Sequence, residues 1–484
     1  MSETSRPAQK GRRVSAKRSA VVLIAGSVLG FLLGMAKSIV LARFLTVADY
    51  GIVGTFTAVL NLVQMSSSFN FQLLLVQHRS GDDIDFGSAV KGLTMARQIL
   101  MAIVIVALGQ PLADLMGQPD LAWAYRCLAL APLISAFNNP DLVRMKRQRR
   151  FGPQLANTIV PGVITLLAIW PLVRLIGDYR VQIVIALMGA ALSLVGSHLL
   201  AERPFRVRWD WDVARLGLRF GWPLMVSGIV LFGAFQGDRI IVANFYSDED
   251  LGLIAAALAM ITAPALFASA LVREYFLPIL APYQDHLARF AERAVFTLQA
   301  TLCAGLVACL GFALAGPFML TLAFGPKYAA GGDLVALLGI AFSIQLMRSG
   351  ASTVALAKGD TLNMLIGNMV RLAFLAPAVL IAIRGMDLIT VLAIGAAGQV
   401  AAYATGVALL YLRSNLHNGC AMILPYGFAA ASLGCLGVAI WQPEAGYAVP
   451  GPAVAASVLF LLATIAASGN MLQEVWRQTG LSRP

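Results

Sequence analysis

Six basic residues stand inside apolar stretches of helical length, where a charged side chain is costly. They are Lys37, Arg97, Arg126, Arg219, Arg348 and Arg371. A charge at the centre of a membrane-spanning helix costs about 2.5–3.5 kcal/mol on insertion scales, so such residues usually face a cavity and serve a function. None of the 24 acidic residues falls deep within these stretches on our limits. The cations therefore lack internal partners, which favours an anionic ligand.

Uncharged polar residues share helix faces with some of these cations. Lys37 continues a stripe of glycines spaced four residues apart, and Asn368 lies one turn before Arg371. Helices that each contribute one polar face enclose a wet cavity. We expect the six cations to line this cavity together with Asn61, Gln64, Ser68, Thr94, Gln98 and Asn368. Arg219 and Arg348 have an alternative, because near a cytoplasmic helix end they could extend to lipid headgroups instead.

The elements that position these residues follow from composition. The 484-residue chain is 59% hydrophobic and 12% charged, whereas a soluble domain is about half apolar and about a quarter charged. Its apolar runs are near the 20 residues that cross a bilayer as a helix. We predict an all-α polytopic membrane protein with about fourteen transmembrane helices, at 19–41, 51–76, 88–108, 121–138, 155–176, 181–200, 216–236, 251–272, 293–318, 331–350, 362–383, 388–411, 420–441 and 448–468.

Basic residues orient these spans, because short cytoplasmic loops retain Lys and Arg. With both termini inside, 24 of the 36 Lys and Arg residues face the cytoplasm and six face the opposite side. The net charge of +12 is thus largely topological and does not indicate nucleic-acid binding. We expect a basic cytoplasmic N-tail (1–18), an N-lobe (19–200), a cytoplasmic linker (201–215), a C-lobe (216–412), two further spans (420–468) and a cytoplasmic C-tail (469–484).

A repeat relates the two lobes. IVLARFLTVADYGIV at Ile39–Val53 resembles IIVANFYSDEDLGLI at Ile240–Ile254, at an offset of 201 residues. Six spans separate the copies, which predicts two six-helix lobes related by a pseudo-two-fold axis along the membrane normal. Each copy is interpreted as a structural corner in which an aspartate caps the following helix. The residues assigned to these corners are Ala42, Arg43, Asp49, Tyr50, Gly51, Asp238, Arg239, Asp250 and Gly252.

Catalytic and metal-binding patterns are missing from the sequence. The five cysteines lie in or beside apolar runs without the spacing of metal ligands. No nucleotide-binding glycine loop, zinc-binding histidine pair or nucleophile elbow occurs. We therefore predict a protein that is not an enzyme and that has no cofactor or metal, with H⁺ or Na⁺ as the candidate coupling ion.

At this point the sequence resembles the Wzx-type polysaccharide and O-antigen flippases of the multidrug/oligosaccharidyl-lipid/polysaccharide (MOP) exporter superfamily, most of all the colanic-acid-exporter-like subgroup. The likeness is carried by ARFLTVADYG, LLLVQHRSGDDIDFGSA, RMKRQRRFGPQLAN and DRIIVANFYSDEDLGL. It implies two lobes that rock around a cationic cavity. It also implies an undecaprenyl-pyrophosphate-linked oligosaccharide as the cargo, moved to the periplasmic leaflet of the bacterial inner membrane for exopolysaccharide, capsule or lipopolysaccharide biosynthesis. Candidate partners are membrane lipids and the polymerase and chain-length machinery.

Three alternatives remain. An H⁺- or Na⁺-coupled multidrug exporter of the same superfamily would need an intramembrane carboxylate, and none is predicted here. A peptidoglycan lipid-precursor flippase would share the lobes and the cationic interior, although the corner motif favours the polysaccharide branch. A membrane scaffold for glycan-assembly enzymes would not transport at all, and it predicts that replacing the buried cations leaves glycan export intact.

Overall fold

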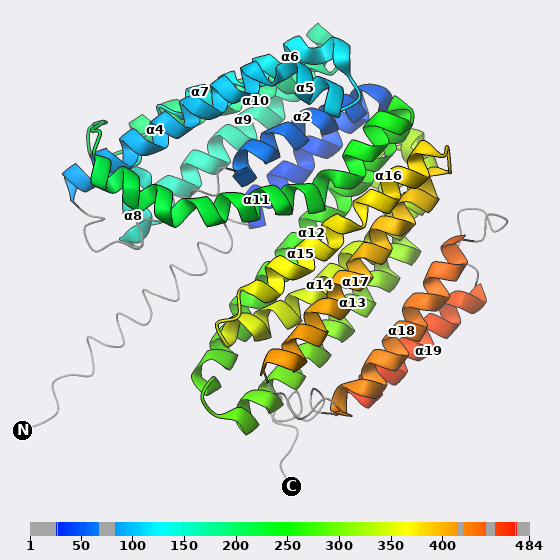
Figure 1. Ribbon diagram of the computed structural model, residues 1–484. Coiled ribbons are helices and arrows are strands. Elements are labelled where there is room, and N and C mark those ends of the chain that lie inside the picture. The colour runs from blue at the N-terminus through cyan, green and yellow to red at the C-terminus, as the bar shows by residue number, and fades with distance from the viewer. Residues whose placement is uncertain are drawn as a thin grey trace, which may run out of the picture. The chain divides into compact units, whose positions relative to one another are not determined.

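The computed structural model describes residues 26, 28–66, 83–148, 150–414, 420–441, 451–469 and 471 of the chain. Within these ranges all regular structure is helical, which confirms the predicted fold class (Figure 1). Eight helical runs are long and apolar enough to cross a membrane, and three shorter apolar helices accompany them among the described residues. The chain separates into two compact units that divide between Phe232 and Gly233.

The first unit contains a helix over residues 28–44 and a series of helices that follow it. These are α2 (Val47–Ser66), α4 (Ile84–Ala107), α5 (Gly109–Leu115), η1 (Pro119–Leu121), α6 (Ala122–Leu128), α7 (Leu130–Ser135), α8 (Asp141–Arg147), α9 (Gly152–Ile176), α10 (Arg180–Leu199) and the first part of α11 (Trp211–Phe245).

The second unit contains the remainder of α11 and the helices after it. These are α12 (Asp248–Leu280), η2 (Ala281–Tyr283), α13 (Leu287–Phe324), η3 (Pro326–Gly331), α14 (Gly332–Ala357), α15 (Leu362–Ala373), α16 (Leu375–Ile383), α17 (Leu388–Ser414), α18 (Cys420–Trp441) and α19 (Gly451–Ala467).

Within the described residues, each of the fourteen predicted spans contains one helix or a broken pair of helices; the first, second and last spans extend beyond these residues. The breaks fall at Ala129, between α6 and α7, and at Phe374, between α15 and α16. Each break precedes a proline by three residues, Pro132 and Pro377. Proline has no N–H to donate to the carbonyl four residues earlier, and its ring clashes with that carbonyl. We predicted a single span over each of these stretches, and the helix is broken within both of them.

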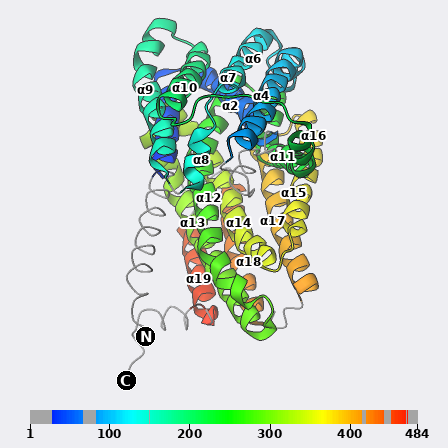
Figure 2. The same ribbon diagram turned by 90° about the vertical axis from the view of Figure 1, so that its left-hand side faces the viewer.

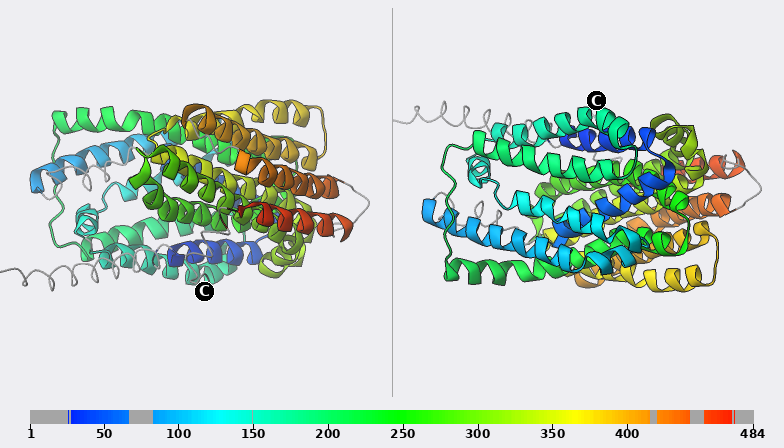
Figure 3. Two further views of the ribbon diagram at one scale, coloured as in Figure 1. Left: turned by 90° about the horizontal axis from the view of Figure 1, so that it is seen from below. Right: turned by 90° about the horizontal axis from the view of Figure 1, so that it is seen from above.

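The two units have different packing centres. In the second unit, α14 is buried along almost its whole length and packs against α12, α13 and α17 (Figure 2). In the first unit, α10 packs against α7 and α9, and α4 packs against α7. The last two helices, α18 and α19, lie side by side as a pair (Figure 3). Their contact is closed by two hydrogen bonds of 3.3 Å, exchanged between the hydroxyl groups and the carbonyls of Ser432 and Ser457.

Helix α11 contributes to both units. Near its start, Ala214 joins a core cluster with Phe86 and Val90 of α4. Near its end, Ile241 packs with Ala378 of α16 and Val391 of α17. The compact units therefore divide within α11, whereas the sequence-based boundary lies in the preceding linker. The C-terminal part of α11 is what brings polar residues to the second unit.

Candidate functional site

Polar side chains gather inside the second unit, on four helices. We call them the arginine cluster: Asp238 of α11, Gln345 and Arg348 of α14, Asn368 and Arg371 of α15, and Gln399 of α17. Five of the six residues have an exposed fraction of 7% or less, and the Asp238 side chain has 13%. Charged and amide groups are rarely buried unless they are paired or functional. The cluster is therefore a candidate binding site.

Arg371 has the most contacts in the cluster. Its Nη2 lies 3.7 Å from Oδ2 of Asp238, and its guanidinium carbon lies 5.1 Å from the ring centre of Phe235. The Gln399 amide is assigned from its neighbours with the oxygen toward Arg371, where it accepts from Nε at 3.1 Å and from Nη1 at 2.7 Å. One carboxylate, one amide oxygen and one aromatic face thus surround this guanidinium.

Arg348 lies beside this arrangement without a carboxylate of its own. Its Nη1 is buried and has no hydrogen-bond partner among the described residues. The positive charge of Arg371 is close enough to repel it. Since two guanidinium groups share one carboxylate, the cluster carries a net charge of +1. A buried excess of positive charge with an unsatisfied donor fits an anion.

Two glycines make room for the charged groups. A Cβ atom at Gly367 of α15 would lie 3.1 Å from Nη1 of Arg348, and a Cβ atom at Gly395 of α17 would lie 2.7 Å from Oδ1 of Asp238. The distance at Gly395 is shorter than the contacts that Cβ atoms make in proteins. The helix backbones therefore approach the charged groups closely, and a side chain at Gly395 would force the Asp238 carboxylate to move.

The structure corrects the prediction that the buried cations have no acidic partner. Helix α11 continues nine residues past the predicted limit of its span, to Phe245, and this places Asp238 beside Arg371. Asp238 and Arg239 were assigned to a corner, yet both lie within the helix before it. The repeat holds a signal for this position, because the offset of 201 residues aligns Asp238 with Lys37.

The remaining predicted cations lie in the first unit. Lys37 is half-buried in the helix at 28–44, and Arg97 is half-buried in α4. Arg126 is exposed near the end of α6, where its side chain passes close to Gly109 of α5. The side chain of Arg219 lies outside the described residues. The structure thus brings together Arg348, Arg371 and Asn368 of the predicted set.

The predicted polar lining of the first unit is described only in part. Asn61 of α2 and Gln98 of α4 are half-buried. The hydroxyl of Thr94 donates to the Val90 carbonyl of its own helix at 2.8 Å, which satisfies that donor locally. The side chain of Gln64 and the whole of Ser68 lie outside the described residues.

The two corners are closed by helix caps. Ser247 is the N-cap of α12, its hydroxyl accepts from the Asp250 N–H at 3.1 Å, and Asp250 accepts from the Ser247 N–H at 3.3 Å. This reciprocal pair is a capping box. In the first corner, the Thr46 hydroxyl accepts from the Asp49 N–H at 3.0 Å and donates to the Asp49 carboxylate at 2.6 Å.

The other corner residues have separate environments. Tyr50 is buried, and its hydroxyl lies 2.6 Å from that of Ser38. Gly51 and Gly252 are buried, Ala42 is fully buried and Arg43 is exposed. The N-caps are Thr46 and Ser247 rather than the predicted aspartates Asp49 and Asp250. A hydroxyl residue three positions before an acidic residue is the signal that would have found them.

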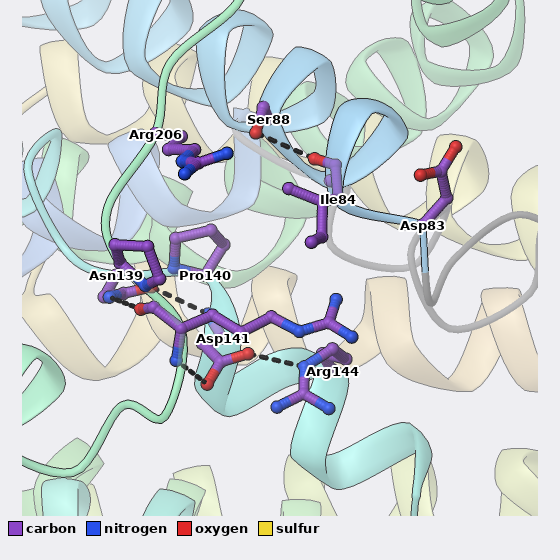
Figure 4. Close-up of a pocket in the computed structure, with 11 residues that line it drawn as sticks. Asp83, Ile84, Ser88, Asn139, Pro140, Asp141, Arg144 and Arg206 are labelled. Atoms are coloured by element: carbon purple, nitrogen blue, oxygen red, sulfur yellow. Dashed lines mark hydrogen bonds and ion pairs between the residues drawn. The ribbon is translucent and has the colours of Figure 1, made fainter.

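A second polar region lies on the predicted cytoplasmic side of the first unit. It is a small pocket between α4, α8 and residues 201–206 (Figure 4). The Asp141 carboxylate accepts from Nε of Arg144 at 2.5 Å and from the backbone N–H groups of Glu202 and Arg203 at 2.8 and 3.0 Å. Burial by itself would raise the pKa of Asp141, but these hydrogen bonds outweigh it and lower the pKa below its usual value. This network fixes the linker to α8.

Lys91 strengthens the same region. Its Nζ is buried and donates to the backbone carbonyls of Ala136 at 2.6 Å and Asn138 at 2.7 Å, just after α7 ends. It also lies 4.9 Å from the ring centre of Phe205 in the linker. A cation is favourable at a helix C-terminus because the last carbonyls carry partial negative charge. Lys91 therefore connects α4 to the end of α7 and to the linker.

Comparison with known proteins gives the family. The sequence profile of the family described as polysaccharide biosynthesis protein matches residues 40–331. The chain is 22% identical over 323 residues to the succinoglycan biosynthesis transport protein ExoT of Rhizobium meliloti (strain 1021), covering 63% of this chain and 62% of that protein. It is 25% identical over 244 residues to the lipid III flippase of Escherichia coli (strain K12), covering 49% and 58%. The matches thus span about three-fifths of the length of these relatives.

Solved structures share the fold at low sequence identity. The inward-facing conformation of a multidrug resistance MATE family transporter of the MOP superfamily aligns with a TM-score of 0.65 and 12% identity, over 80% of this chain and 94% of that one. The lipid II flippase MurJ in an inward closed conformation aligns with a TM-score of 0.64 and 12% identity, over 95% and 99%. With the family profile matching more than half of its length, this chain belongs to the polysaccharide biosynthesis protein family.

Proposed function

We propose that this protein is a flippase that carries an undecaprenyl-pyrophosphate-linked oligosaccharide from the cytoplasmic to the periplasmic leaflet of the bacterial inner membrane. The observation that carries the proposal is the buried excess of positive charge in the arginine cluster. A pyrophosphate linkage supplies the missing negative charge. The named activities of the relatives, succinoglycan transport and lipid III flipping, agree with a lipid-linked glycan as the class of cargo.

The roles of the side chains follow from their chemistry. The planar guanidinium groups of Arg348 and Arg371 present forked N–H donors, which match phosphate oxygens in a bidentate manner. The amide groups of Gln345 and Asn368 both donate and accept, as recognition of sugar hydroxyls requires. Burial strengthens each of these interactions, because the surroundings screen charge less than water does. In the predicted orientation both chain termini lie in the cytoplasm.

Cells test the proposal directly. Replacing Arg348 and Arg371 together with glutamine keeps the side chains polar and removes both charges. Because hydrogen bonds to charged groups are each worth about 1.5–3 kcal/mol, we expect surface polysaccharide to fall at least about tenfold while its lipid-linked precursor accumulates. Arg413→Gln is the matched control, since it breaks an exposed ion pair with Asp360 (3.2 Å) outside the cluster.

The level of each variant in the membrane is measured alongside, so that lost protein is distinguished from lost transport. A double variant that is present at the normal level and exports polysaccharide normally contradicts the assignment of the cluster as the binding site. A gene deletion that leaves all surface glycans unchanged contradicts the flippase proposal itself.

The multidrug exporter remains a second candidate because of Asp238, which supplies the carboxylate that such a transporter needs. However, Asp238 is already paired with Arg371, and the net charge of the cluster repels a cationic drug. The same strains distinguish the two functions. Altered tolerance to cationic drugs with unchanged glycan would favour the exporter.

A further inference from the structure

The ion pair between Asp238 and Arg371 is unusually loose for a buried pair. Charge-assisted hydrogen bonds between an arginine and a carboxylate normally join N and O at about 2.7–2.9 Å, often at two positions. Here Nη2 and Oδ2 are 3.7 Å apart, and no donor among the described residues lies within hydrogen-bonding distance of the Asp238 carboxylate. Charge attraction therefore holds the pair, without the hydrogen bonds that would lock it.

Asp238 and Arg371 lie on different helices, so their side chains can separate without breaking either helix. Asp238 is on α11, while Arg371 is on α15 and is held separately by the Gln399 amide of α17. The carboxylate faces Gly395, where the helix backbone leaves space and offers no side chain to bind it. Arg371 therefore keeps a fixed position on Gln399 when its contact with Asp238 is exchanged for another anion.

The second guanidinium makes the exchange dependent on charge. Asp238 neutralises one of the two arginines, and Nη1 of Arg348 has no partner among the described residues. An anion with one negative charge can only replace Asp238, which is already in place and loses no freedom by binding. An anion with two or more negative charges can neutralise both arginines.

We propose that Asp238 is an internal counterion that holds Arg371 until a pyrophosphate displaces it, and that it thereby excludes singly charged phosphodiesters from the arginine cluster. The inference rests on the proposed function, and it identifies the pyrophosphate as the group of the cargo that the arginine cluster recognises. Ordinary phospholipid headgroups are phosphodiesters with one negative charge on the phosphate, and they surround the protein in large excess. A pyrophosphate that links a lipid to a sugar carries two charges. Asp238 is therefore a specificity-determining residue.

The test uses the purified full-length protein in nanodiscs of zwitterionic lipid. Inorganic pyrophosphate and dimethyl phosphate, a singly charged phosphodiester, are titrated against the wild type, Asp238→Asn and Arg371→Gln. The wild type should bind pyrophosphate in preference to dimethyl phosphate, and Arg371→Gln should lose most of that binding. Asp238→Asn should bind pyrophosphate at least about tenfold more tightly and should gain measurable binding of dimethyl phosphate, since repulsion by a buried negative charge is removed.

Two further variants keep the test decisive. Asp238→Ser removes the same charge with a smaller side chain, in case the asparagine variant does not fold. Asp360→Asn is the control, because it neutralises a carboxylate that pairs with Arg413 away from the cluster, and it should change neither affinity. The proposal is overturned if removing the Asp238 charge leaves both affinities unchanged or weaker, if the wild type binds both anions equally, or if it binds neither.

These results are separable from the test of the proposed function. If the nanodisc experiment shows no charge selectivity while the arginine double variant still loses surface polysaccharide in cells, the counterion proposal is refuted and the flippase proposal stands. If the charge selectivity is as expected but deletion of the gene leaves the surface glycans unchanged, the flippase proposal is refuted. The protein then retains an anion-binding site whose charge selectivity is set by Asp238.

Discussion

Replacing Asp141 with alanine should destabilise the first unit severely. The carboxylate accepts a charge-assisted hydrogen bond from Arg144 and two backbone hydrogen bonds from the linker, and its side chain is only 3% exposed. The substitution also leaves the guanidinium of Arg144, which is 10% exposed, without its closest acceptor. Breaking a buried ion pair by removing one partner typically costs about 3–5 kcal/mol, and we expect a loss in this range.

The assay is thermal unfolding of the purified protein in detergent, followed by tryptophan fluorescence, with Asp212→Ala as the control. Asp212 and Arg215 form the same type of pair, three residues apart on one helix, but their side chains are 95% and 84% exposed. An exposed pair contributes about 0–1 kcal/mol, so the control should unfold close to the wild-type temperature. If Asp141→Ala and Asp212→Ala unfold at the same temperature, the reasoning from burial is refuted.

The pH dependence provides a second check on the same carboxylate. Its pKa is lower in the folded protein than the usual value of 3.8, so folding favours the ionised form. The stabilisation is therefore fully present above pH 3.8 and is lost as the pH falls through the folded pKa. The stability difference between the wild type and Asp141→Asn should be constant from pH 5 to pH 8 and should shrink only below about pH 4. A difference that changes between pH 5 and pH 8 would contradict this assignment.

Other predictions follow from single contacts. Ser247→Ala should lower stability by about 1 kcal/mol, since it removes the hydroxyl that caps Asp250, and thermal unfolding measures this loss. Gly395→Ala should reduce surface polysaccharide, because its Cβ crowds the α11 carboxylate, while Gly427→Ala, with no atom within 4 Å of the added Cβ, should not. Lys91→Met should cost about 2–4 kcal/mol, because two buried carbonyls after α7 lose their donor, and detergent unfolding with limited proteolysis would detect it.

The positions of the helices could be predicted because hydropathy is a local property. A run of about 20 apolar residues predicts a span whatever its neighbours are, so every predicted span contains helix. The breaks at Ala129 and Phe374 were also readable, since RCLALAP at 126–132 and RLAFLAP at 371–377 place a proline six residues after an arginine. A hydropathy window averages over such prolines, which is why neither break was predicted.

The pairing of Asp238 with Arg371 could not be predicted from local pattern. The two residues are far apart in the sequence, and their contact depends on how α11 packs against α15. The polar string around Asp238 ended the apolar run early, although the capped corner at Ser247 indicates that the helix continues to Phe245. The helix boundary was thus available from capping chemistry, whereas the partner required tertiary structure.

The same pair has a consequence for the biogenesis of the protein. During synthesis α11 leaves the ribosome before α15, with α12, α13 and α14 between them. Until α15 arrives, the Asp238 carboxylate lacks its partner Arg371, and an acidic residue within a nascent transmembrane helix raises the free energy of its insertion by up to about 2.5–3.5 kcal/mol. Release of α11 from the translocon into lipid is therefore more favourable once α15 has been made, which predicts that α11 to α15 are released together as one group.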